Sequence, residues 1–574
     1  MKRELRKVWQ VAPPIPPEVA DELHAYGMVM RQLLYNRGIH TAQEAGVYLE
    51  QSGPLHDPFL MMGMAQAIER LERALGSGEH IAVYGDYDVD GVTATVLLVQ
   101  VLRRLGGRAD AYIPDRFDEG YGLNNAALDK LLSEGFSLVV TVDCGIRSLA
   151  EAEHARQIGL DMIISDHHEP RVELPSGLAV INPRQAGDLY PEKNLAGVGL
   201  SFKIAQALCQ RLTESGVRAE NWLDLVAVGT VADIVPLSGE NRTLVKAGME
   251  MLRRGQRQGL WSLVRAAGFE TCQNLSARDI GFMLGPRLNA AGRLDSAMAA
   301  FHLLMSEDKN ESGDLAVSLD DQNRERQRLT QSMQVEAEAL FAGDEAAPYL
   351  IFATKPEFDF KLAGLVGLVA SRLTDTYYRP AIVACQENGF VRASCRSIPE
   401  FNITQALDQC ADLLVRHGGH AMAAGFTVRQ ENLAELVNNL NAIAFSQLAH
   451  RALRPVLNAD LELPLHQLRP DILTDLDRLE PTGVGNHSAY FVSRELQVKR
   501  TILMGKENQH LRLVVSDGKI TYDAVAFRMG YMAKDLPPKI DLLYAFERNY
   551  YNGRVSLQLM ARDIRPSDGS EMEF

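Results

Sequence analysis

Residues 81–91 are Ile-Ala-Val-Tyr-Gly-Asp-Tyr-Asp-Val-Asp-Gly, and this stretch decides the fold class. Its apolar, β-branched start is typical of a short buried strand. Three carboxylates follow, at Asp86, Asp88 and Asp90, and a helical pattern runs on from Val92 to about Leu105. The acids therefore stand where a strand of an α/β sheet gives way to a helix. Folds of this class bind their ligands at that carboxyl edge of the sheet.

The acidic triplet has two interpretations. Carboxylates this close together repel one another, and a hard divalent cation offsets the repulsion because it prefers oxygen ligands. The alternative is an acidic loop that is merely solvated. The triplet alone does not decide between a metal site and a solvated loop, so the rest of the sequence has to be weighed.

Short apolar runs and helical stretches alternate from His80 onward, which predicts a parallel, doubly wound sheet. The expected strands cover residues 81–84, 109–113, 138–142, 162–165 and 178–181. Acids or imidazoles follow the first four of them: Asp86, Asp88 and Asp90; Asp115 with Arg116; Asp143; and Asp166 with His167 and His168. Because parallel strands share one carboxyl edge, we expect these groups to gather at one site.

Each of these residues also has a purely structural interpretation. Asp143 alone is typical of a turn or a helix cap. His167 and His168 would point to opposite faces of a strand, although both can reach one site where the strand ends. Imidazole beside carboxylates suits Mn²⁺, Fe²⁺ or Zn²⁺ better than an all-oxygen magnesium cage. A site this acidic could hold two metal ions about 3.5–4 Å apart, the usual arrangement for hydrolysing phosphate esters.

Two later segments add candidates. Asp233 lies in the apolar helical run of residues 222–235, where an acid is costly unless it is paired, metal-bound or at a helix end. We interpret it as a metal ligand. Residues 285–293 place Arg287 and Arg293 among small residues, and arginine presents a planar fork that suits phosphate. The alternative for these arginines is an ordinary surface loop.

Together the motifs around Asp86, Asp143, Asp166 and Asp233 resemble the DHH phosphoesterase superfamily, which is named for its Asp-His-His. The resemblance implies a phosphoesterase with one or two Mn²⁺ or Mg²⁺ ions, and two ions are expected here. The metal ligands that it implies are Asp88, Asp90, Asp143, His167 and Asp233. It implies catalytic roles for His168, as a ligand or a partner of the leaving group, and for Asp86 and Asp166, which would orient ligands.

Residues 346–455 form a second α/β pattern that contains His417-Gly-Gly-His. Glycines beside an imidazole allow close approach of backbone to an anion. After a DHH domain this segment resembles the DHHA1 domain, in which such a loop contacts substrate. The resemblance implies phosphate contacts from Arg116, Arg287, Arg293, Arg396, Ser397, Gly418, Gly419 and His420. The chain departs from many relatives at Lys361 and Leu362, where they carry Trp-His, so that histidine's role is in doubt.

Residues 456–574 are expected to be all-β and OB-like, with five or six short strands separated by turns such as Ser516-Asp-Gly. Basic and aromatic residues interleave there, including Lys499, Arg500, Phe527 and Arg528. An OB barrel stacks the bases of a single strand on such a face. The alternative is a solvated β surface with ordinary core aromatics.

Length and composition fit several domains. At 574 residues the chain exceeds one core. We expect a lead-in at 1–55, the DHH domain at 56–296, a helical connector at 297–345, the DHHA1 domain at 346–455 and the OB-like domain at 456–574. The six cysteines show no CxxC spacing, and no signal peptide or membrane span is apparent, so we expect a cytoplasmic protein without a disulfide framework. A net charge of −15 still allows a narrow basic channel.

This domain order resembles that of the bacterial exonucleases of the superfamily. It implies a single-stranded-DNA-specific 5′ to 3′ exonuclease that acts in recombination and repair, binds single-stranded DNA as a monomer, and works beside a single-strand binding protein and a helicase. Two alternatives remain. One is a DHH phosphoesterase for short RNA or signalling nucleotides, and the other is a non-catalytic DNA-binding scaffold of the same superfamily.

Overall fold

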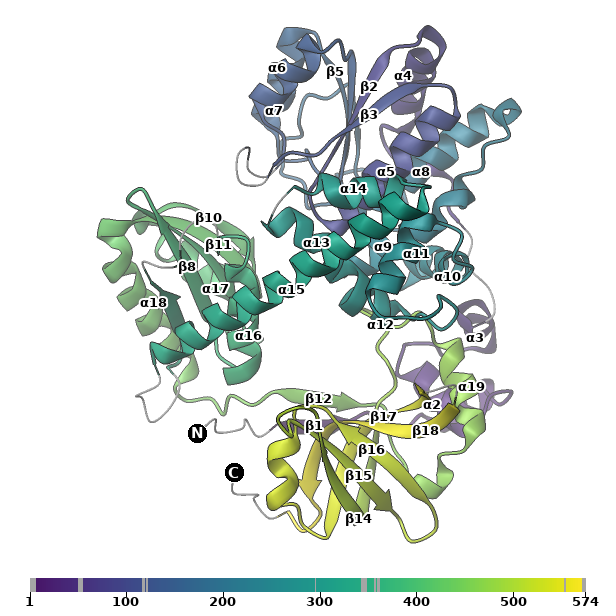
Figure 1. Cartoon of the computed structure of the whole chain (residues 1–574), viewed down its shortest axis with the longest axis vertical. Helices are drawn as coiled ribbons and strands as arrows, with labels where there is room; N and C mark the ends of the chain where they lie inside the picture. Colours follow the sequence, from purple (N-terminus) through teal and green to yellow (C-terminus); the bar gives the residue numbers. More distant parts are fainter. Residues whose placement is uncertain are drawn as a thin grey trace. The chain divides into compact units, whose positions relative to one another are not determined.

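Figure 1 shows the chain as a computed structural model. The structure describes residues 7–49, 55–115, 119, 122–294, 296–341, 348–355, 358, 362–551 and 554–569. The chain divides into two compact units. One is the continuous segment Pro54–Leu453, and the other combines Met1–Gly53 with Arg454–Phe574.

The continuous unit opens with a five-stranded parallel sheet in the order β3-β2-β4-β5-β6. Its strands are β2 (His80–Gly85), β3 (Arg108–Tyr112), β4 (Leu138–Val142), β5 (Asp161–Ser165) and β6 (Ala179–Ile181). The first strand, β2, lies between the second and third, so the strand order reverses between β2 and β4. Open α/β sheets bind ligands at such a reversal. The predicted doubly wound sheet is confirmed.

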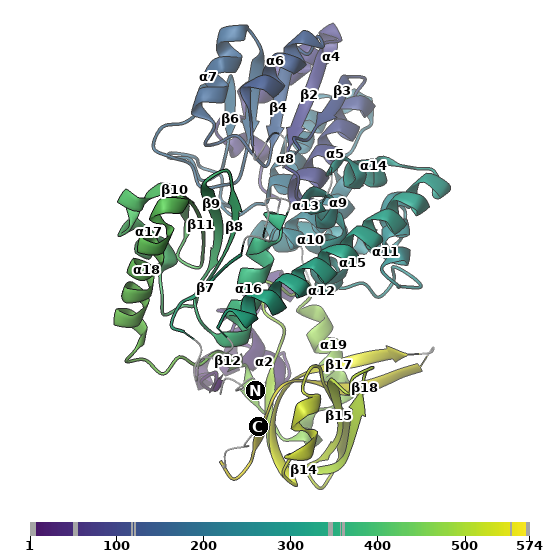
Figure 2. The same ribbon diagram turned by 60° about the vertical axis from the view of Figure 1, so that its left-hand side comes forward.

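Helices cover both faces of this sheet (Figure 2). Ile81 and Val83 of β2 share a core with α4 (Met64–Ser77), α5 (Val89–Arg104) and α8 (Gly197–Arg211). Ala82 and Tyr84 pack on the opposite face with α6 (Asn125–Ser133) and α7 (Leu149–Ile158). Because successive side chains of a strand point to opposite faces, a strand covered on both sides is apolar at nearly every position.

A group of helices follows the sheet. They are α9 (Leu223–Ala232), α10 (Gly239–Arg253), α11 (Gln258–Ala266), α12 (Ala277–Asp279), the π-helical turn η4 (Ile280–Leu284), α13 (Gly285–Leu294) and α14 (Met298–Met305). We predicted that the helix bearing Asp233 runs to residue 235, but α9 ends at Ala232 and Asp233 is its C-cap. The next residue, Ile234, has φ of 65°, a left-handed conformation that interrupts a helix and that β-branched residues rarely adopt.

The long helix α15 (Lys309–Ala339) is the connector expected from the charged segment. It is more than a solvated spacer. Ala316 and Leu319 in its first half belong to the core of the parallel sheet, whereas Met333 and Ala337 in its second half belong to a core of the next domain. One helix thus contributes apolar side chains to both domains of this unit (Figure 1).

The second domain of the unit is a five-stranded mixed sheet in the order β10-β11-β9-β8-β7. Its strands are β7 (Ile351–Thr354), β8 (Ala381–Glu387), β9 (Phe390–Arg396), β10 (Leu414–His420) and β11 (Ala423–Arg429). Helix α16 (Val366–Tyr377) packs on one face, and α17 (Ile403–Asp408) and α18 (Leu433–Leu448) pack on the other. This is the small α/β domain that the sequence predicted.

The other unit contains a closed barrel. Its sheet has the order β13-β14-β15-β16-β18-β17, and pairing of β14 with β17 closes it. The strands are β13 (Leu461–Glu462), β14 (Phe491–Met504), β15 (His510–Ser516), β16 (Thr521–Ala526), β17 (Lys539–Tyr551) and β18 (Arg554–Pro566), and α19 (Pro470–Arg478) precedes β14. We predicted two strands where β14 is continuous. A register shift between Ser493 and Leu496, with Glu495 at φ 53°, forms a bulge that interrupts the alternating pattern.

Residues 7–49 are part of this barrel unit rather than an isolated lead-in. They form β1 (Val8–Val11), α1 (Pro17–Glu22), α2 (Met28–Tyr35) and α3 (Ala42–Leu49). Strand β1 pairs in parallel with β12 (Val456–Ala459), and the indole of Trp9 donates a hydrogen bond of 2.6 Å to Asp563. Leu23, Met30 and Leu33 lie in the same core as the barrel strands.

Candidate metal centre

The acidic motif after β2 starts α5. Asp88 is the N-cap of that helix, and its Oδ1 accepts a hydrogen bond from Gly91 N at 3.1 Å. Gly91 has no room for a side chain, because a Cβ there would lie 2.6 Å from the carbonyl oxygen of Asp86. The tight turn therefore requires glycine, and it brings Asp86, Asp88 and Asp90 to the carboxyl end of β2.

Asp90 is fully buried and held by the start of α8. Its two carboxylate oxygens accept hydrogen bonds from Gly197 N at 2.6 Å and Val198 N at 2.8 Å. Backbone N–H groups at a helix N-terminus are a favourable place for an anion. Sequence analysis missed these two donors, because backbone donors leave no trace in residue type.

His167 is the centre of the cluster. Its Nε2 lies 3.1 Å from Asp143 Oδ1, 3.6 Å from Asp233 Oδ2 and 3.9 Å from Asp90 Oδ2. Asp143 follows β4 in a left-handed conformation, with φ of 61°. The structure thus brings four of the five predicted ligands together at His167 Nε2. Asp90, Asp143 and His167 follow strands of the parallel sheet, whereas Asp233 is the C-cap of α9.

His168 and Asp166 form a separate pair beside the cluster. His168 Nδ1 lies 2.7 Å from Asp166 Oδ1, and Asp166 Oδ2 accepts a hydrogen bond from Ile146 N at 2.9 Å. Burial lowers the pKa of His168, but the hydrogen bond to Asp166 and the surrounding carboxylates outweigh that effect and raise it. Asp166 therefore orients His168 and favours its protonated form.

The buried acids of the cluster are poorly matched by positive charge. Burial and the charge of Asp88 raise the pKa of Asp90 to about 7, despite its two backbone donors. Burial and the charges of Asp90 and Asp88 raise the pKa of Asp233 to about 9, and burial with the neighbouring carboxylates raises that of Asp143 well above its usual range. Burial lowers the pKa of His167 to about 4. These acids therefore ionise together only when a cation balances their charge, and the neutral form of His167 is the one that binds a metal ion.

The donor atoms fit divalent metal ions. Three groups have ligand atoms within 4.8 Å of one another: Asp90, His167 and Asp233; Asp86, Asp88 and Asp143; and Asp143, His167 and His168. Within the described residues, the buried atoms Asp143 Oδ1, Asp233 Oδ2 and His167 Nε2 make no hydrogen bond. Buried polar atoms normally have a partner, so these three are available as ligands.

The predicted phosphate contacts of the first domain have other partners. Arg116 lies outside the described residues. Arg287 Nε donates to Asp320 Oδ1 at 2.9 Å and its Nη1 to the carbonyl of Met283 at 2.6 Å. Arg293 Nη1 donates to the carbonyl of Gly364 at 2.8 Å, so it joins α13 to the second domain. None of these contacts tests a role in phosphate binding.

In the second domain, Arg396 ends β9 and its Nη1 donates to Cys395 O at 2.8 Å and to Ser394 Oγ at 3.2 Å. Ser397 is buried, and its hydroxyl donates to Phe401 O at 2.6 Å. Gly418, Gly419 and His420 end the edge strand β10. Gly419 has φ of 145°, and a Cβ there would lie 2.4 Å from Ala423 O, so only glycine fits.

The departure from relatives at residues 361 and 362 is partly visible. Lys361 lies outside the described residues, and Leu362 packs against the core shared by α15 and α16. A leucine in this position contributes packing where a histidine would contribute a polar group.

Sequence analysis also missed Asn182 and Arg184. Asn182 Nδ2 donates to His168 O at 2.8 Å, and its Oδ1 accepts from Arg184 N at 2.8 Å. Both residues follow β6, the fifth strand of the sheet. The rule that strand ends deliver polar groups to the site, applied to the first four strands only, could have found them.

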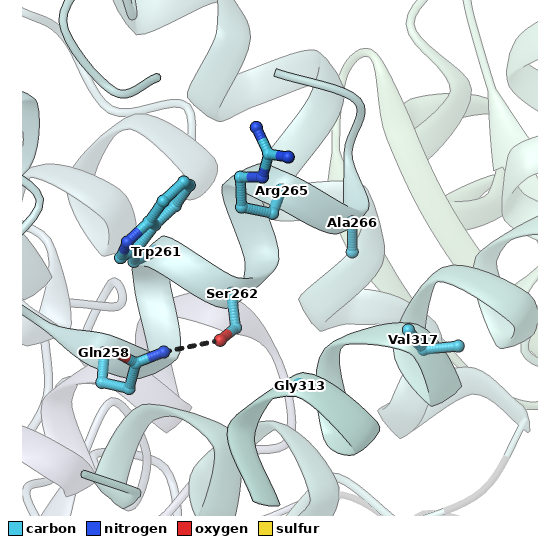
Figure 3. Close-up of a pocket in the computed structure, with 7 residues that line it drawn as sticks. All are labelled: Gln258, Trp261, Ser262, Arg265, Ala266, Gly313 and Val317. Carbon is cyan, nitrogen blue, oxygen red and sulfur yellow. Dashed lines mark hydrogen bonds between the residues drawn. The ribbon is translucent and has the colours of Figure 1, made fainter. Parts of the chain in front are cut away.

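One surface hollow of about 360 Å³ lies away from this cluster, between α11 and α15 (Figure 3). It is lined by Gln258, Trp261, Ser262, Arg265, Ala266, Gly313 and Val317, and Gln258 donates a hydrogen bond of 3.0 Å to Ser262. Its lining residues include no carboxylate or imidazole, so it lacks the metal-binding groups found at the sheet edge.

Three domain families match the chain in the expected order. They are the DHH family, N-terminal domain, at residues 80–230, the DHHA1 domain at residues 359–444, and the RecJ OB domain at residues 459–563. The chain is 38% identical over 568 residues to the single-stranded-DNA-specific exonuclease RecJ of Bacillus subtilis, covering 98% of this chain and 71% of the relative. The Escherichia coli protein of the same description is 34% identical over 574 residues, with 96% and 98% covered. The chain belongs to the RecJ family.

Solved RecJ structures agree with this assignment. RecJ of Thermus thermophilus in complex with Mn²⁺ has a TM-score of 0.82 and 30% sequence identity, covering 97% of this chain and 79% of that one. Its complex with Mg²⁺ has a TM-score of 0.76. The RecJ fold therefore holds Mn²⁺ or Mg²⁺, as the family resemblance implied. Within the described residues, none of the helices of this RecJ chain is both long and apolar enough to cross a membrane.

Proposed function

We propose that this chain is a metal-dependent exonuclease that hydrolyses single-stranded DNA from its 5′ end during recombination and repair. The observation that carries the proposal is the buried cluster of carboxylates around His167 Nε2, at the strand-order reversal of a sheet that aligns with RecJ exonucleases. The 5′ to 3′ direction rests on the family resemblance alone.

Mn²⁺ or Mg²⁺ at this site would activate a water molecule and stabilise the charge on the scissile phosphate. Asp90, His167 and Asp233 would hold one ion, and Asp86, Asp88 and Asp143 a second, because these form two groups of three ligands. The backbone donors at Gly197 and Val198 fix Asp90 in its ligand orientation.

His168 suits the role of general acid. Its Nδ1 is bonded to Asp166, its side chain is 42% exposed, and the hydrogen bond to Asp166 with the nearby carboxylates raises its pKa, which favours the imidazolium that carries a proton on Nε2. We infer that Nε2 gives this proton to the 3′ oxygen that leaves when the phosphodiester breaks. Asp166 accepts the Nδ1 proton, so it fixes the orientation of the ring and stabilises the imidazolium.

Arg293, Arg396 and His420 remain our candidates for the 5′-terminal phosphate, together with Arg116, Arg287, Ser397, Gly418 and Gly419. We favour Arg396 among them, because in the part of the chain that the structure describes its hydrogen bonds go to neutral oxygens. Ser397 is the weakest, because its hydroxyl is bonded to Phe401 inside the domain. The OB domain would bind the strand that follows, and a single-strand binding protein and a helicase are the proposed partners in the cytoplasm.

The proposal is tested with a 5′-phosphorylated single strand, labelled at either end, beside its duplex and an RNA of the same sequence. We expect loss of the DNA strand from its 5′ end in Mn²⁺, no loss in EDTA, and survival of the duplex. The Asp143→Asn variant, purified in parallel, controls for contaminating nucleases. Degradation from the 3′ end, or preference for a short RNA, would contradict the proposal.

A further inference from the structure

Two arginines outside the predicted site both contact Glu169, the residue that follows the DHH motif. Arg147 follows β4 and its Nε donates to the carbonyl of Glu169 at 3.0 Å. Arg184 follows β6 and its Nη1 lies 3.5 Å from Glu169 Oε2. Glu169 directly follows His168 in the chain. Both guanidinium groups thus lie at the rim of the metal centre, at the ends of two strands of the parallel sheet.

Arg184 is held in one orientation. Its Nε donates to Lys193 O at 3.0 Å and its Nη2 to Asn194 Oδ1 at 3.2 Å. Its own N–H donates to Asn182, which in turn donates to the carbonyl of His168. These partners are neutral oxygens, so they fix the side chain without cancelling its charge.

The position of Arg147 is also tied to the DHH motif. Its neighbour Ile146 donates its backbone N–H to Asp166 Oδ2 at 2.9 Å. The side chain of Arg147 is exposed, and its recorded hydrogen bond is to a neutral carbonyl. The chain next to Arg147 is therefore bonded to Asp166, and the chain next to Arg184 is bonded through Asn182 to His168.

The guanidinium of Arg184 is close enough to act on the metal ligands. Its charge opposes the rise in the pKa of Asp233 and adds to the fall in the pKa of His167, although burial is the main cause of both shifts. The loop that holds Arg184 at Lys193 and Asn194 continues directly to Gly197, which binds Asp90. Arg184 is thus linked to the metal centre in two ways: its hydrogen-bond partners belong to the segment that leads to Gly197, and its charge affects Asp233 and His167.

The negative charge at the rim is too small to neutralise two arginines. In the part of the chain that the structure describes, Glu169 is the one carboxylate recorded within ion-pair distance of Arg184. That side chain is 60% exposed and the contact is long, at 3.5 Å, so the pair is weak. The two guanidinium groups both lie next to Glu169 and supply positive charge and planar N–H donors, which are the features of arginine that bind a phosphate.

We propose that Arg147 and Arg184 form a second phosphate-binding position, which holds a phosphate of the same DNA strand next to the phosphodiester being hydrolysed. The inference rests on the proposed function, because its ligand is the backbone of the bound single strand. Both residues bind and position substrate, and neither takes part in bond breaking.

The first test is the salt dependence of binding. A labelled single strand is titrated with the wild type, Arg147→Ala, Arg184→Ala and the double variant in EDTA, where no cleavage occurs, over a series of salt concentrations. One phosphate contact contributes about 0.7 to the slope of log K against log salt for a single strand. We expect the double variant to lose about 0.7 of that slope.

The matched control is Arg156→Ala. Arg156 is an exposed arginine of the same domain, paired with Glu153 at 2.6 Å near the C-terminal end of α7, away from the carboxyl edge of the sheet. Arg156→Ala removes one charge, as each single variant does, so its slope should equal that of the wild type while Arg147→Ala and Arg184→Ala each lose slope. An equal loss of slope in Arg156→Ala and in each of the two single variants would mean that net charge alone is measured and would overturn the proposal.

The second test locates the phosphate. Strands that carry one neutral methylphosphonate linkage, placed successively along the first few positions, are digested in Mn²⁺ by the wild type and the double variant. At the contacted linkage the substitution should slow the wild type about tenfold and leave the double variant unchanged, so the two losses are not additive. Additive losses at every position would overturn the proposal.

A structural role of Arg184 would give a different result. If Arg184 only supports the loop that binds Asp90, its variant needs more Mn²⁺ for half-maximal activity while the salt slope stays unchanged, and the proposal fails. If it holds phosphate, the Mn²⁺ requirement is unchanged and KM rises. Absence of wild-type digestion would refute the proposed function, whereas the binding slopes would still report on Arg147 and Arg184.

Discussion

Two buried groups of charges in the same domain differ in how they are balanced. Lys203 and Glu240 are fully buried, lie 2.5 Å apart, and are completed by Tyr190, whose hydroxyl donates to Glu240, and by the carbonyl of His56. Around His167, by contrast, buried acids face one another without a matching cation. The first group is satisfied by the protein alone and the second only when a metal ion is added. A buried group of charges therefore indicates a metal-binding site when side chains of opposite charge do not balance it.

The largest effect should come from Asp143→Asn. Asparagine tolerates the left-handed conformation at this position, so the fold should survive. We expect exonuclease activity to fall about 10³-fold, the size of losing one electrostatic contact to the transition state. Stability in EDTA should rise, because one buried like charge is removed. Loss of stability together with activity would contradict the contrast between the two groups.

Glu240→Gln should lower stability and leave activity intact, the reverse of Asp143→Asn. It leaves the Lys203 ammonium buried without its carboxylate, which costs about 3–5 kcal/mol of unfolding free energy. Activity of the folded protein in Mn²⁺ should stay near that of the wild type. Urea unfolding followed by tryptophan fluorescence measures the loss, and the double variant with Lys203→Met should recover most of it. A fall in kcat without a change in stability would refute this assignment.

A smaller effect is the pH dependence of stability without metal. The folded-state pKa of Asp233 is raised to about 9 from 3.8, so between pH 7 and 9 the folded protein binds a proton that the unfolded chain has lost. Stability in EDTA should therefore fall as pH rises through this window, by about 1 kcal/mol per pH unit. The low pKa of His167, about 4, acts only below this window. Saturating Mg²⁺ or Asp233→Asn should flatten the decline, and an equal slope in all three samples would contradict it.

The smallest effect should come from the exposed pair of Arg156 and Glu153, which lie 2.6 Å apart on α7. Exposed ion pairs are screened by water and contribute little. Arg156→Ala should change neither the urea midpoint nor the exonuclease rate measurably. A clear loss of stability would show that proximity of opposite charges, and not burial, separates these groups.

The sequence predicted the parallel sheet and most of the metal centre for one physical reason. Strands buried on both faces are apolar throughout, so the acids that end them, from Asp86 to Asp166, stand out. Asp233 was found because an acid interrupts an apolar run, although the helix ends one residue before it. These features are local in the sequence.

The features that were not predicted from the sequence depend mainly on contacts between residues far apart in the chain. The backbone donors at Gly197 and Val198 have no side-chain signature, and Ser397 turns its hydroxyl inward to Phe401. The continuous β14 was divided in prediction because a bulge at Glu495 breaks its alternation. Strand β1 pairs with β12, and the local sequence of residues 8–11 does not predict that pairing.

The pairing of β1 with β12 has a consequence for biosynthesis. Residues 7–49 leave the ribosome long before Val456–Ala459 and the barrel strands are synthesised. The unit Pro54–Leu453 is continuous in sequence, so we expect it to fold before the barrel unit. The barrel strands that pack against Leu23, Met30 and Leu33 are therefore absent during most of translation. A chain truncated before Arg454 would lack the strands that cover the apolar side chains of residues 7–49. We expect those exposed side chains to be bound by chaperones and cut by proteases.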